Sequence, residues 1–454
     1  MLITMRYFLA FTRHLWYNNF CMGIPADHFK DIEVNMTVYY INQLLILGLA
    51  FPLCLYKPNK IKKAAYLAVT FGYMWFLATF RVGIGFDYLS YIDIFVKIKA
   101  APDLAAVLDM MYEPGFELLT WVMTRFVTSP VMMYGVYSAI IFIPVAVFIF
   151  CYSRDVWLST WMYMTLSYFY SSMNFIRQNI ACGILLLGYK FLREKKPVPY
   201  LCIVLLGACF HKTALIMIPI YFLSHLRLGK KTGIFYACAT LIGYLTSTAI
   251  LNFITSYPFK HEIFQIFQSY KDSIYIDPAY GFPLTFLIVP FVTFGACLAL
   301  RPIWEKRDPD ANMLLNMMLF SSIMWLFITR HFIIERFSHY AYLLALVAIP
   351  SALSCLQSPK EDYALLAELE AKEKQDGKGG KSKGKAELNQ VRQLRQNISD
   401  HKKYYWSAVV ALLLITGIYN EFGQHVNNFH NVFPYQSVFE TEGPDFSNYE
   451  TWEL

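Results

Sequence analysis

The apolar residues of this chain form long blocks, unlike the alternation typical of strands or the single stripe of a surface helix. Blocks at 64–80, 131–150, 282–300 and 313–327 each approach the roughly 20 apolar residues that cross a hydrocarbon core of about 30 Å. Backbone groups in lipid must be hydrogen-bonded internally, and blocks without alternation favour helices over a β-barrel. The pattern therefore predicts an all-α fold, a polytopic transmembrane helical bundle.

The blocks predict about twelve crossings. They fall near 38–56, 64–80, 131–151, 156–172, 177–193, 199–210, 213–226, 232–252, 281–300, 311–329, 337–356 and 404–420. Basic clusters at 57–63, 193–196, 227–231 and 301–307 lie between blocks, and the positive-inside rule places them in the cytoplasm. By parity, the extracytoplasmic side then holds 81–112, 171–174, 211–212, 254–280, 330–336 and the C-terminal tail.

Two segments do not fit a simple count of crossings. The stretch 199–225 is too short for two full spans, and it predicts a hairpin of short helices with His211 at its tip. The run 114–127 cannot be a full crossing without breaking parity. We expect it to be re-entrant or to lie in the membrane interface.

Composition agrees with this picture and narrows the partners. The chain is 57% hydrophobic and only 16% charged, and its net charge of +7 sits in the short clusters, which argues against a nucleic-acid partner. The nine cysteines show no metal-ligand or disulfide-framework spacing. We expect four segments: 1–35, an extension of uncertain role before a natural first span; 36–356, the bundle with the candidate site; 357–403, a disordered Lys/Glu/Gly-rich cytoplasmic linker; and 404–454, the last span with an extracytoplasmic tail.

The first outside loop carries charged and aromatic candidates, Arg81, Asp87, Tyr88, Tyr91 and Glu113. Each charged one also has a structural explanation. An arginine at a helix exit can reach lipid headgroups, Asp87 can cap the next helix, and Glu113 precedes a proline that suits a first helical position.

Arg177 and Gln178 open an otherwise apolar helix, where the helix dipole disfavours a cation. A planar guanidinium suits bidentate contact with phosphate. The alternative is a salt bridge from Arg177 to Asp87 or Glu113, and the sequence leaves both open.

His211 and Lys212 interrupt an apolar run with two adjacent titratable side chains. Ionisable residues at membrane depth cost several kcal/mol, so they indicate function. A neutral histidine can accept a proton from a hydroxyl, and a cation can hold a phosphate oxygen. A hydrogen-bonded core histidine is the alternative.

The last polar cluster is 330–340. If it is helical, His331, Glu335 and His339 share one face, but the zinc-hydrolase pattern is absent, so we expect no metal. Glu335 is expected to pair with a nearby arginine, and Arg336 to contact substrate.

All the charged candidates fall on the extracytoplasmic half under a topology set by other residues. They are Arg81, Asp87, Glu113, Arg177, His211, Lys212, Arg330 and Arg336. Several cations with a few carboxylates at one membrane face suit a lipid-linked pyrophosphate substrate.

These stretches resemble the EpsG family of membrane polysaccharide-polymerisation proteins, related to Wzy-type polymerases. In family order over roughly 36–440, the matching stretches are 80–91, 113–116 (Glu-Pro-Gly-Phe), 176–181 (Ile-Arg-Gln-Asn-Ile-Ala), 209–214 (Cys-Phe-His-Lys-Thr-Ala), 335–337 (Glu-Arg-Phe) and 433–435 (Phe-Pro-Tyr). Two features depart from the family pattern: Lys212 and Thr213 stand where small residues are common, and a charged insertion precedes the last span.

The resemblance implies a GT-C-like, metal-independent membrane glycosyltransferase in the bacterial plasma (inner) membrane, with no cofactor. It would join undecaprenyl-diphosphate-linked oligosaccharide repeats into capsule, exopolysaccharide or O-antigen. Its partners would be the lipid-linked donor and acceptor, membrane lipid, a flippase and a chain-length regulator.

The implied roles are distributed over the candidate residues. Arg177, Arg81 and Arg336 would neutralise the departing diphosphate, with Gln178 and Lys212 as further substrate contacts. His211 would take the proton of the incoming hydroxyl, with Asp87 or Glu113 as rival bases. Tyr88 and Tyr91 would stack on sugar rings, although aromatics at membrane edges usually form interfacial belts.

Two alternatives use the same residues. A glycosyltransferase that adds one sugar from a polyprenyl-phosphate donor would need a similar outside site. A flippase for the lipid-linked unit is less favoured, because the sequence shows no internal repeats with broken helices at the midplane.

Overall fold

The computed structural model describes residues 37–110, 112–257, 277, 284–378, 385–426, 428, 430–432 and 435–439. Within these ranges the chain is helical and has no β-strand, only an isolated bridge between Arg81 and Ser437. The expected all-α fold is therefore confirmed for this part of the chain. The extension 1–35, most of the loop 254–280 and the end of the tail lie outside the described residues.

The helices occur in two runs. The first contains α3 (Thr37–Leu49), α4 (Lys60–Phe80), α5 (Tyr88–Ala100), α6 (Leu104–Leu108), α7 (Pro114–Met123), α8 (Pro130–Tyr152), α9 (Val156–Thr165), α10 (Tyr168–Asn174), α11 (Ile176–Leu187), α12 (Tyr189–Arg193), α13 (Pro197–Ala208) and α14 (Met217–Ser224). The second contains α15 (Lys230–Ser256), α17 (Ile288–Arg307), α18 (Ala311–Ile328), α19 (Glu335–Tyr342), α20 (Ala345–Ser354), α21 (Lys360–Lys378) and α22 (Lys385–Asn420). Short 3-10 turns are η2 (Lys212–Ile216), η4 (Leu284–Leu287) and η5 (Phe332–Ile334), and π-helical turns are η1 (Ala50–Leu55) and η6 (Glu421–Val426).

Six helices of the described part are long and apolar enough to cross a membrane. They are Thr37–Leu55, Pro130–Tyr152, Lys230–Ser256, Leu284–Arg307, Ala311–Ile328 and Leu388–Gln424. A bent pair, Phe332–Tyr342 with Ala345–Ser354, gives a seventh if it counts as one span. The protein is thus a membrane protein by its helices, but the predicted number of twelve is not confirmed.

Of the remaining predicted spans, 64–80 lies in the unbroken 21-residue helix α4, which is not among the six, and the others are shorter or broken. The run 156–172 breaks at Ser167, whose φ of 68° is left-handed, so that α9 and α10 are separate helices. The run 337–356 bends by 51° between α19 and α20. Apolar length alone does not reveal such breaks.

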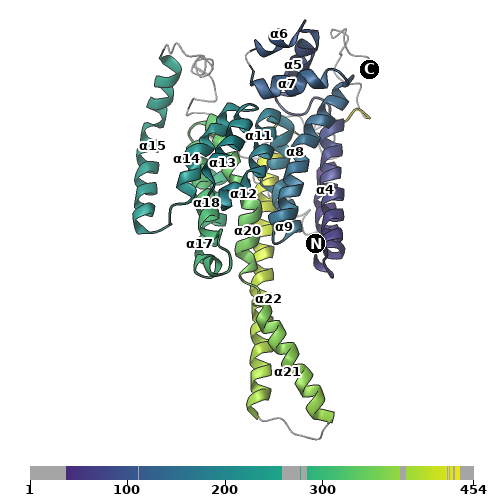
Figure 1. The fold of residues 1–454 in the computed structure, drawn as a ribbon, viewed down its shortest axis with the longest axis vertical. Coiled ribbons are helices and arrows are strands. Elements are labelled where there is room, and N and C mark those ends of the chain that lie inside the picture. Colours follow the sequence, from purple (N-terminus) through teal and green to yellow (C-terminus); the bar gives the residue numbers. More distant parts are fainter. Residues whose placement is uncertain are drawn as a thin grey trace, which may run out of the picture.

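The predicted hairpin over 199–225 is present, because α13 and α14 flank a turn that contains His211. The run 114–127 forms α7, which begins at a proline and lies with α5 and α6 across one end of the bundle (Figure 1).

The charged segment before the last span differs from its prediction. Instead of a disordered linker over 357–403, α21 and the first part of α22 form a helical hairpin that projects from the other end of the bundle (Figure 1). Ala, Leu, Glu, Gln and Lys are strong helix formers, and an ion pair between Arg395 and Glu370 at 2.8 Å joins the two helices. Residues 379–384, in the middle of this segment, lie outside the described residues.

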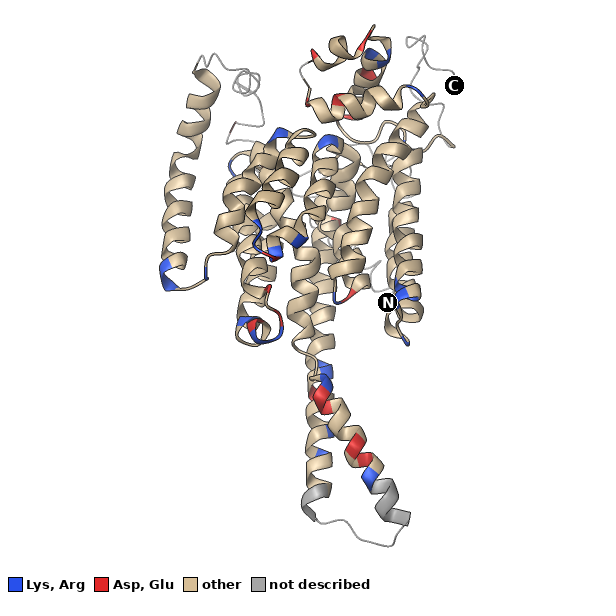
Figure 2. Ribbon diagram, viewed as in Figure 1, with Lys and Arg blue, Asp and Glu red and all other residues tan. Residues whose placement is uncertain are grey.

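Basic residues gather at the end of the bundle from which this hairpin projects, for example at the starts of α4 and α15 (Figure 2). This is the distribution that the positive-inside rule expects of the cytoplasmic side. We therefore take the end that carries α5–α7 as extracytoplasmic.

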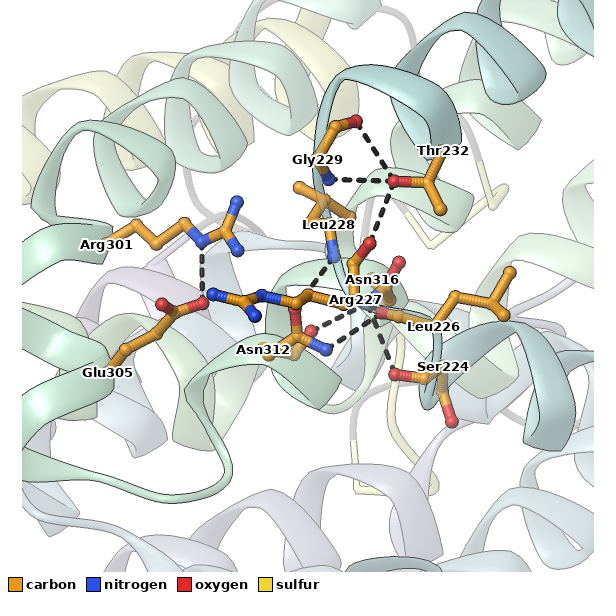
Figure 3. A network of polar contacts seen from close by, with 10 residues as sticks. All are labelled: Ser224, Leu226, Arg227, Leu228, Gly229, Thr232, Arg301, Glu305, Asn312 and Asn316. Atoms are coloured by element: carbon orange, nitrogen blue, oxygen red, sulfur yellow. Dashed lines mark hydrogen bonds and ion pairs between the residues drawn. The ribbon is translucent and has the colours of Figure 1, made fainter.

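At the basic end, two asparagines of α18 hold the turn between α14 and α15 (Figure 3). Asn312 accepts the N–H of Leu228 at 3.0 Å, and Asn316 donates to the carbonyl oxygens of Ser224 at 3.2 Å and Leu226 at 2.8 Å. Each of these contacts satisfies a backbone group that the turn leaves without a helical partner. They fix the α14–α15 hairpin to α18.

Candidate functional site

Glu113, Arg177 and His211 form a cluster at the end of the bundle that carries α5–α7, with Arg177 partly exposed. The carboxylate of Glu113 meets Arg177 Nη1 at 2.5 Å through Oε2, and His211 Nδ1 at 3.2 Å through Oε1. The same Oε1 accepts the backbone N–H of Lys212 at 3.3 Å. Glu113 therefore links three segments that are far apart in the sequence, namely the starts of α7 and α11 and the turn after α13.

Local sequence explains why these segments meet. Pro114 starts α7, with Glu113 as its N-cap residue. The N–H of Gly115 donates to the carbonyl oxygen of Cys209 at 2.8 Å, and a Cβ at Gly115 would lie only 2.7 Å from that oxygen. Only glycine allows this approach, which brings Glu113 to the histidine turn.

The first turn of α11 is fixed by a tyrosine. The backbone N–H of Arg177 donates to the Tyr91 hydroxyl at 3.4 Å, and the Tyr91 ring packs edge-on against Phe116 at 6.1 Å. The guanidinium of Arg177 also lies 5.6 Å from the ring centroid of Tyr112. Aromatic residues of the α5–α7 layer thus orient the arginine.

The charge states follow from these contacts. Burial alone would raise the pKa of Glu113, but the hydrogen bond from His211 and the charge of Arg177 lower that pKa to about 2. Burial lowers the pKa of His211, with the carboxylate of Glu113 acting in the opposite direction. At neutral pH, Glu113 is a carboxylate and His211 is neutral.

A carboxylate can only accept a hydrogen bond, so His211 must carry its proton on Nδ1. Its Nε2 is then an unprotonated acceptor, and this buried atom has no hydrogen-bond partner among the described residues. Chemically, the pair is a base whose tautomer is set by a carboxylate.

Other predicted residues surround the cluster. The Gln178 amide donates to the Arg336 carbonyl oxygen at 2.8 Å, and its own Oε1 is buried without a partner in the described part. Burial raises the pKa of Asp87, while the charges of Arg336 and Arg177 act to lower it. The half-buried Asp87 and Arg336 therefore lie within electrostatic range of the site.

Arg81 and Tyr88 lie elsewhere, in the supporting layer. Arg81 is 1% exposed, and its guanidinium sits 4.1 Å from the ring centroid of Tyr134 and donates to the Met173 carbonyl oxygen at 3.1 Å. Tyr88 stacks on the same Tyr134 ring, with 4.8 Å between the ring centroids. Both side chains are buried, and so is that of Tyr91, so none of the three offers an open surface for the predicted substrate contact.

The cluster at 330–340 divides between two places. Arg330 donates to the Tyr244 carbonyl oxygen at 2.7 Å, and His331 Nε2 meets the hydroxyls of Ser247 and Thr248, so both residues hold α15. Glu335 is buried, and its Oε2 has no hydrogen-bond partner in the described ranges. The charge of Arg336 acts on this carboxyl, and the expected ion pair with an arginine stays a prediction.

Sequence reasoning missed three supporting contacts. Thr213 and Tyr340 share a hydrogen bond of 2.9 Å beside the histidine turn. The tail contacts both the first loop and α4: the N–H of Val82 donates to the Gln436 carbonyl oxygen at 2.9 Å, and the Tyr435 hydroxyl donates to the Leu77 carbonyl oxygen of α4 at 2.9 Å. In the sequence, Gly115 in the Glu-Pro-Gly stretch is the feature that could have indicated the close approach to Cys209.

No group of three or more His, Cys, Asp or Glu side chains that could hold a metal occurs in the described residues. A model of the EpsG family matches residues 64–367 of the chain. No curated protein and no solved structure matches it, so the expected GT-C likeness stays a prediction. The tail stretch 433–435 lies beyond the family match, and Phe433 and Pro434 fall outside the described residues.

Proposed function

The chain belongs to the EpsG family, and from that premise we propose that it polymerises undecaprenyl-diphosphate-linked oligosaccharide repeats into capsular polysaccharide, exopolysaccharide or O-antigen. Family membership and the apolar helices make it a membrane protein of polysaccharide biosynthesis. The proposal places the reaction at the outer face of the bacterial plasma membrane, in a multi-pass protein.

One observation supports the proposal: the buried His211 Nε2 has no hydrogen-bond partner in the part of the chain that the structure describes, while Nδ1 bonds to Glu113. In the reaction, the hydroxyl oxygen of the acceptor sugar bonds to the anomeric carbon of the donor glycan. The hydroxyl proton passes to His211 Nε2, which is the general base. Glu113 orients the imidazole and stabilises the imidazolium that forms, so it is the partner of the base rather than a rival.

The bond between the anomeric carbon and the lipid diphosphate breaks in the same step, and negative charge grows on the leaving oxygen. Arg177 is placed to neutralise that charge, because its Nε is buried without a partner in the described part while Nη1 binds Glu113. Lys212 and Arg336, on the two neighbouring segments, supply further positive charge. The groups needed at the diphosphate are thus side chains of this chain.

A deletion strain tests the function. Loss of long glycan, with a complete single repeat still made and exported on its lipid, and restoration by the wild-type gene would support the polymerase. An incomplete repeat would instead point to the single-sugar transferase. A complete repeat retained at the cytoplasmic face would contradict both enzymes and favour transport.

Activity should respond to pH in one direction. The base works neutral, and burial holds the pKa of His211 below its ordinary 6.5, so the rate should stay constant at neutral pH and fall only in more acidic medium. Glu113, with a pKa of about 2, stays charged throughout. Initial rates of glycan elongation in membrane vesicles measure this. A rate that rises on acidification below neutrality would contradict the assignment.

Gly115→Ala should damage the site with a single methyl group. The new Cβ would lie 2.7 Å from the Cys209 carbonyl oxygen, and the resulting shift would separate Glu113 from His211. We expect a loss of about 1–3 kcal/mol of stability and most of the activity. The control is Gly72→Ala in α4, where nothing lies within 4 Å. Equal thermal stability and elongation rate in the two variants would refute the role of Gly115.

A further inference from the structure

The outward face of α7 is apolar although it lies at the end of the bundle. Leu118, Val122 and Phe126, spaced four residues apart in α7 and the turn that follows, are 46%, 46% and 52% exposed. The opposite face, with Phe116 and Met123, is buried against the protein. That buried face also holds the polar residues Glu117 and Thr120, so the exposed face is the more apolar of the two. An exposed row of large apolar side chains is unfavourable in water and is typical of a contact with lipid.

A second feature fixes the depth. The guanidinium of Arg125 lies 4.5 Å from the ring centroid of Trp121, and both belong to this segment. Tryptophan and arginine together favour the headgroup level, where one part of the side chain is apolar and the other meets phosphate and water.

The apolar surface also continues into a helix able to cross the membrane. Phe126 is followed by the start of α8, where Met132 is 44% exposed, and further along α8 Ile143 is 62% exposed. Along the chain, the exposed apolar positions of α7 therefore continue into those of a helix long enough to cross the membrane.

We infer that the face of α7 formed by Leu118, Val122 and Phe126 is embedded in the outer leaflet of the bilayer at the level of the phospholipid headgroups. Helices that lie in this plane bury their apolar face about 5–10 Å into the boundary between headgroups and acyl chains. Figure 1 shows α7 lying across the end of the bundle, as this orientation requires.

The consequence for the site is one of depth. Glu113 is the N-cap of α7, so the depth of α7 in the membrane also sets the depth of the Glu113–His211 pair. A lipid-linked diphosphate carries its phosphates at the headgroup level. This consequence rests on the proposed function, whereas the membrane contact does not.

The membrane contact is tested with the full chain, all nine cysteines replaced by serine, in liposomes of phosphatidylethanolamine and phosphatidylglycerol. Val122→Cys, labelled with a fluorophore before reconstitution, should be quenched by lipids that carry a nitroxide near the headgroup. The unlabelled cysteine should react slowly with a membrane-impermeant maleimide. Ser90→Cys on the exposed surface of α5 is the control, with fast reaction and weak quenching expected. Equal fast reaction at both positions, or protection of Val122→Cys without lipid quenching, would overturn the inference.

The depth consequence has its own readout. Val122→Asp should raise the KM for the lipid-linked repeat several-fold with a smaller change in kcat, because the charge draws α7 toward water. The control variant Val122→Leu keeps an apolar side chain and should retain the wild-type KM. If quenching shows the contact but Val122→Asp leaves KM unchanged, the depth-setting role is wrong. If neither wild type nor variants elongate glycan while quenching persists, the proposed function fails and the membrane contact stands.

Discussion

Glu113→Gln should reduce elongation by roughly 10²-fold or more while the protein remains folded. The glutamine has nearly the shape of the glutamate, but its amide group can donate to His211 Nδ1 and so move the imidazole proton to Nε2. The base would then be lost without loss of any side-chain volume. Initial rates in membrane vesicles, with the amount of protein measured by immunoblot, give the result.

The matched control is Glu117→Gln, one helical turn further along α7. Glu117 is 1% exposed and accepts the N–H of Tyr112 at 2.9 Å, which a glutamine oxygen can also do. Burial raises the pKa of Glu117, so a neutral side chain is a small change there. If the two variants lose the same activity, the special role of Glu113 is not supported.

Arg177→Ala should lower the elongation rate by roughly 10²–10³-fold, the size expected for removal of one group that stabilises developing charge. The change also leaves the buried carboxylate of Glu113 without its cation, so some loss of stability accompanies it. Arg177→Lys keeps a charge but loses the guanidinium fork, which binds Glu113 and would bind the phosphate in the proposed reaction, so this variant should recover little of the rate. Rates and thermal unfolding of the purified variants separate the two effects.

Lys97→Ala provides the control for loss of a cation in the same layer. Lys97 forms an exposed ion pair with Asp93 at 2.6 Å in α5, and such pairs contribute at most about 1 kcal/mol. If Arg177→Ala elongates glycan at a rate close to that of Lys97→Ala, Arg177 does not take part in the reaction.

The helical membrane fold could be predicted from the sequence because long apolar blocks have few physical solutions in lipid. The number of spans could not, because breaks such as the left-handed Ser167 and the bend after α19 depend on tertiary packing rather than hydropathy. The projecting α21–α22 hairpin was missed for a related reason. Its charged composition fits a disordered chain and an exposed helix equally well, although Ala, Leu, Glu and Lys also have a high helix propensity.

The candidate site was partly predictable. An arginine, a histidine and a glutamate in apolar surroundings indicate a site at membrane depth, and the structure brings Arg177, His211 and Glu113 together. The sequence left open whether Arg177 pairs with Asp87 or Glu113, and distance decides for Glu113. Arg81 also follows an apolar span, but its guanidinium is buried against the Tyr134 ring, a contact that the sequence does not reveal.

The most direct test of the central claim uses purified protein in liposomes with one substrate, the oligosaccharide repeat linked to undecaprenyl diphosphate. The wild-type chain should form glycans of two and more repeats and release undecaprenyl diphosphate for each new bond, with no other protein added. Glu113→Gln, reconstituted to the same level, should release almost none. Wild-type protein that leaves the substrate unchanged, or a Glu113→Gln variant that elongates it at the wild-type rate, would contradict the account.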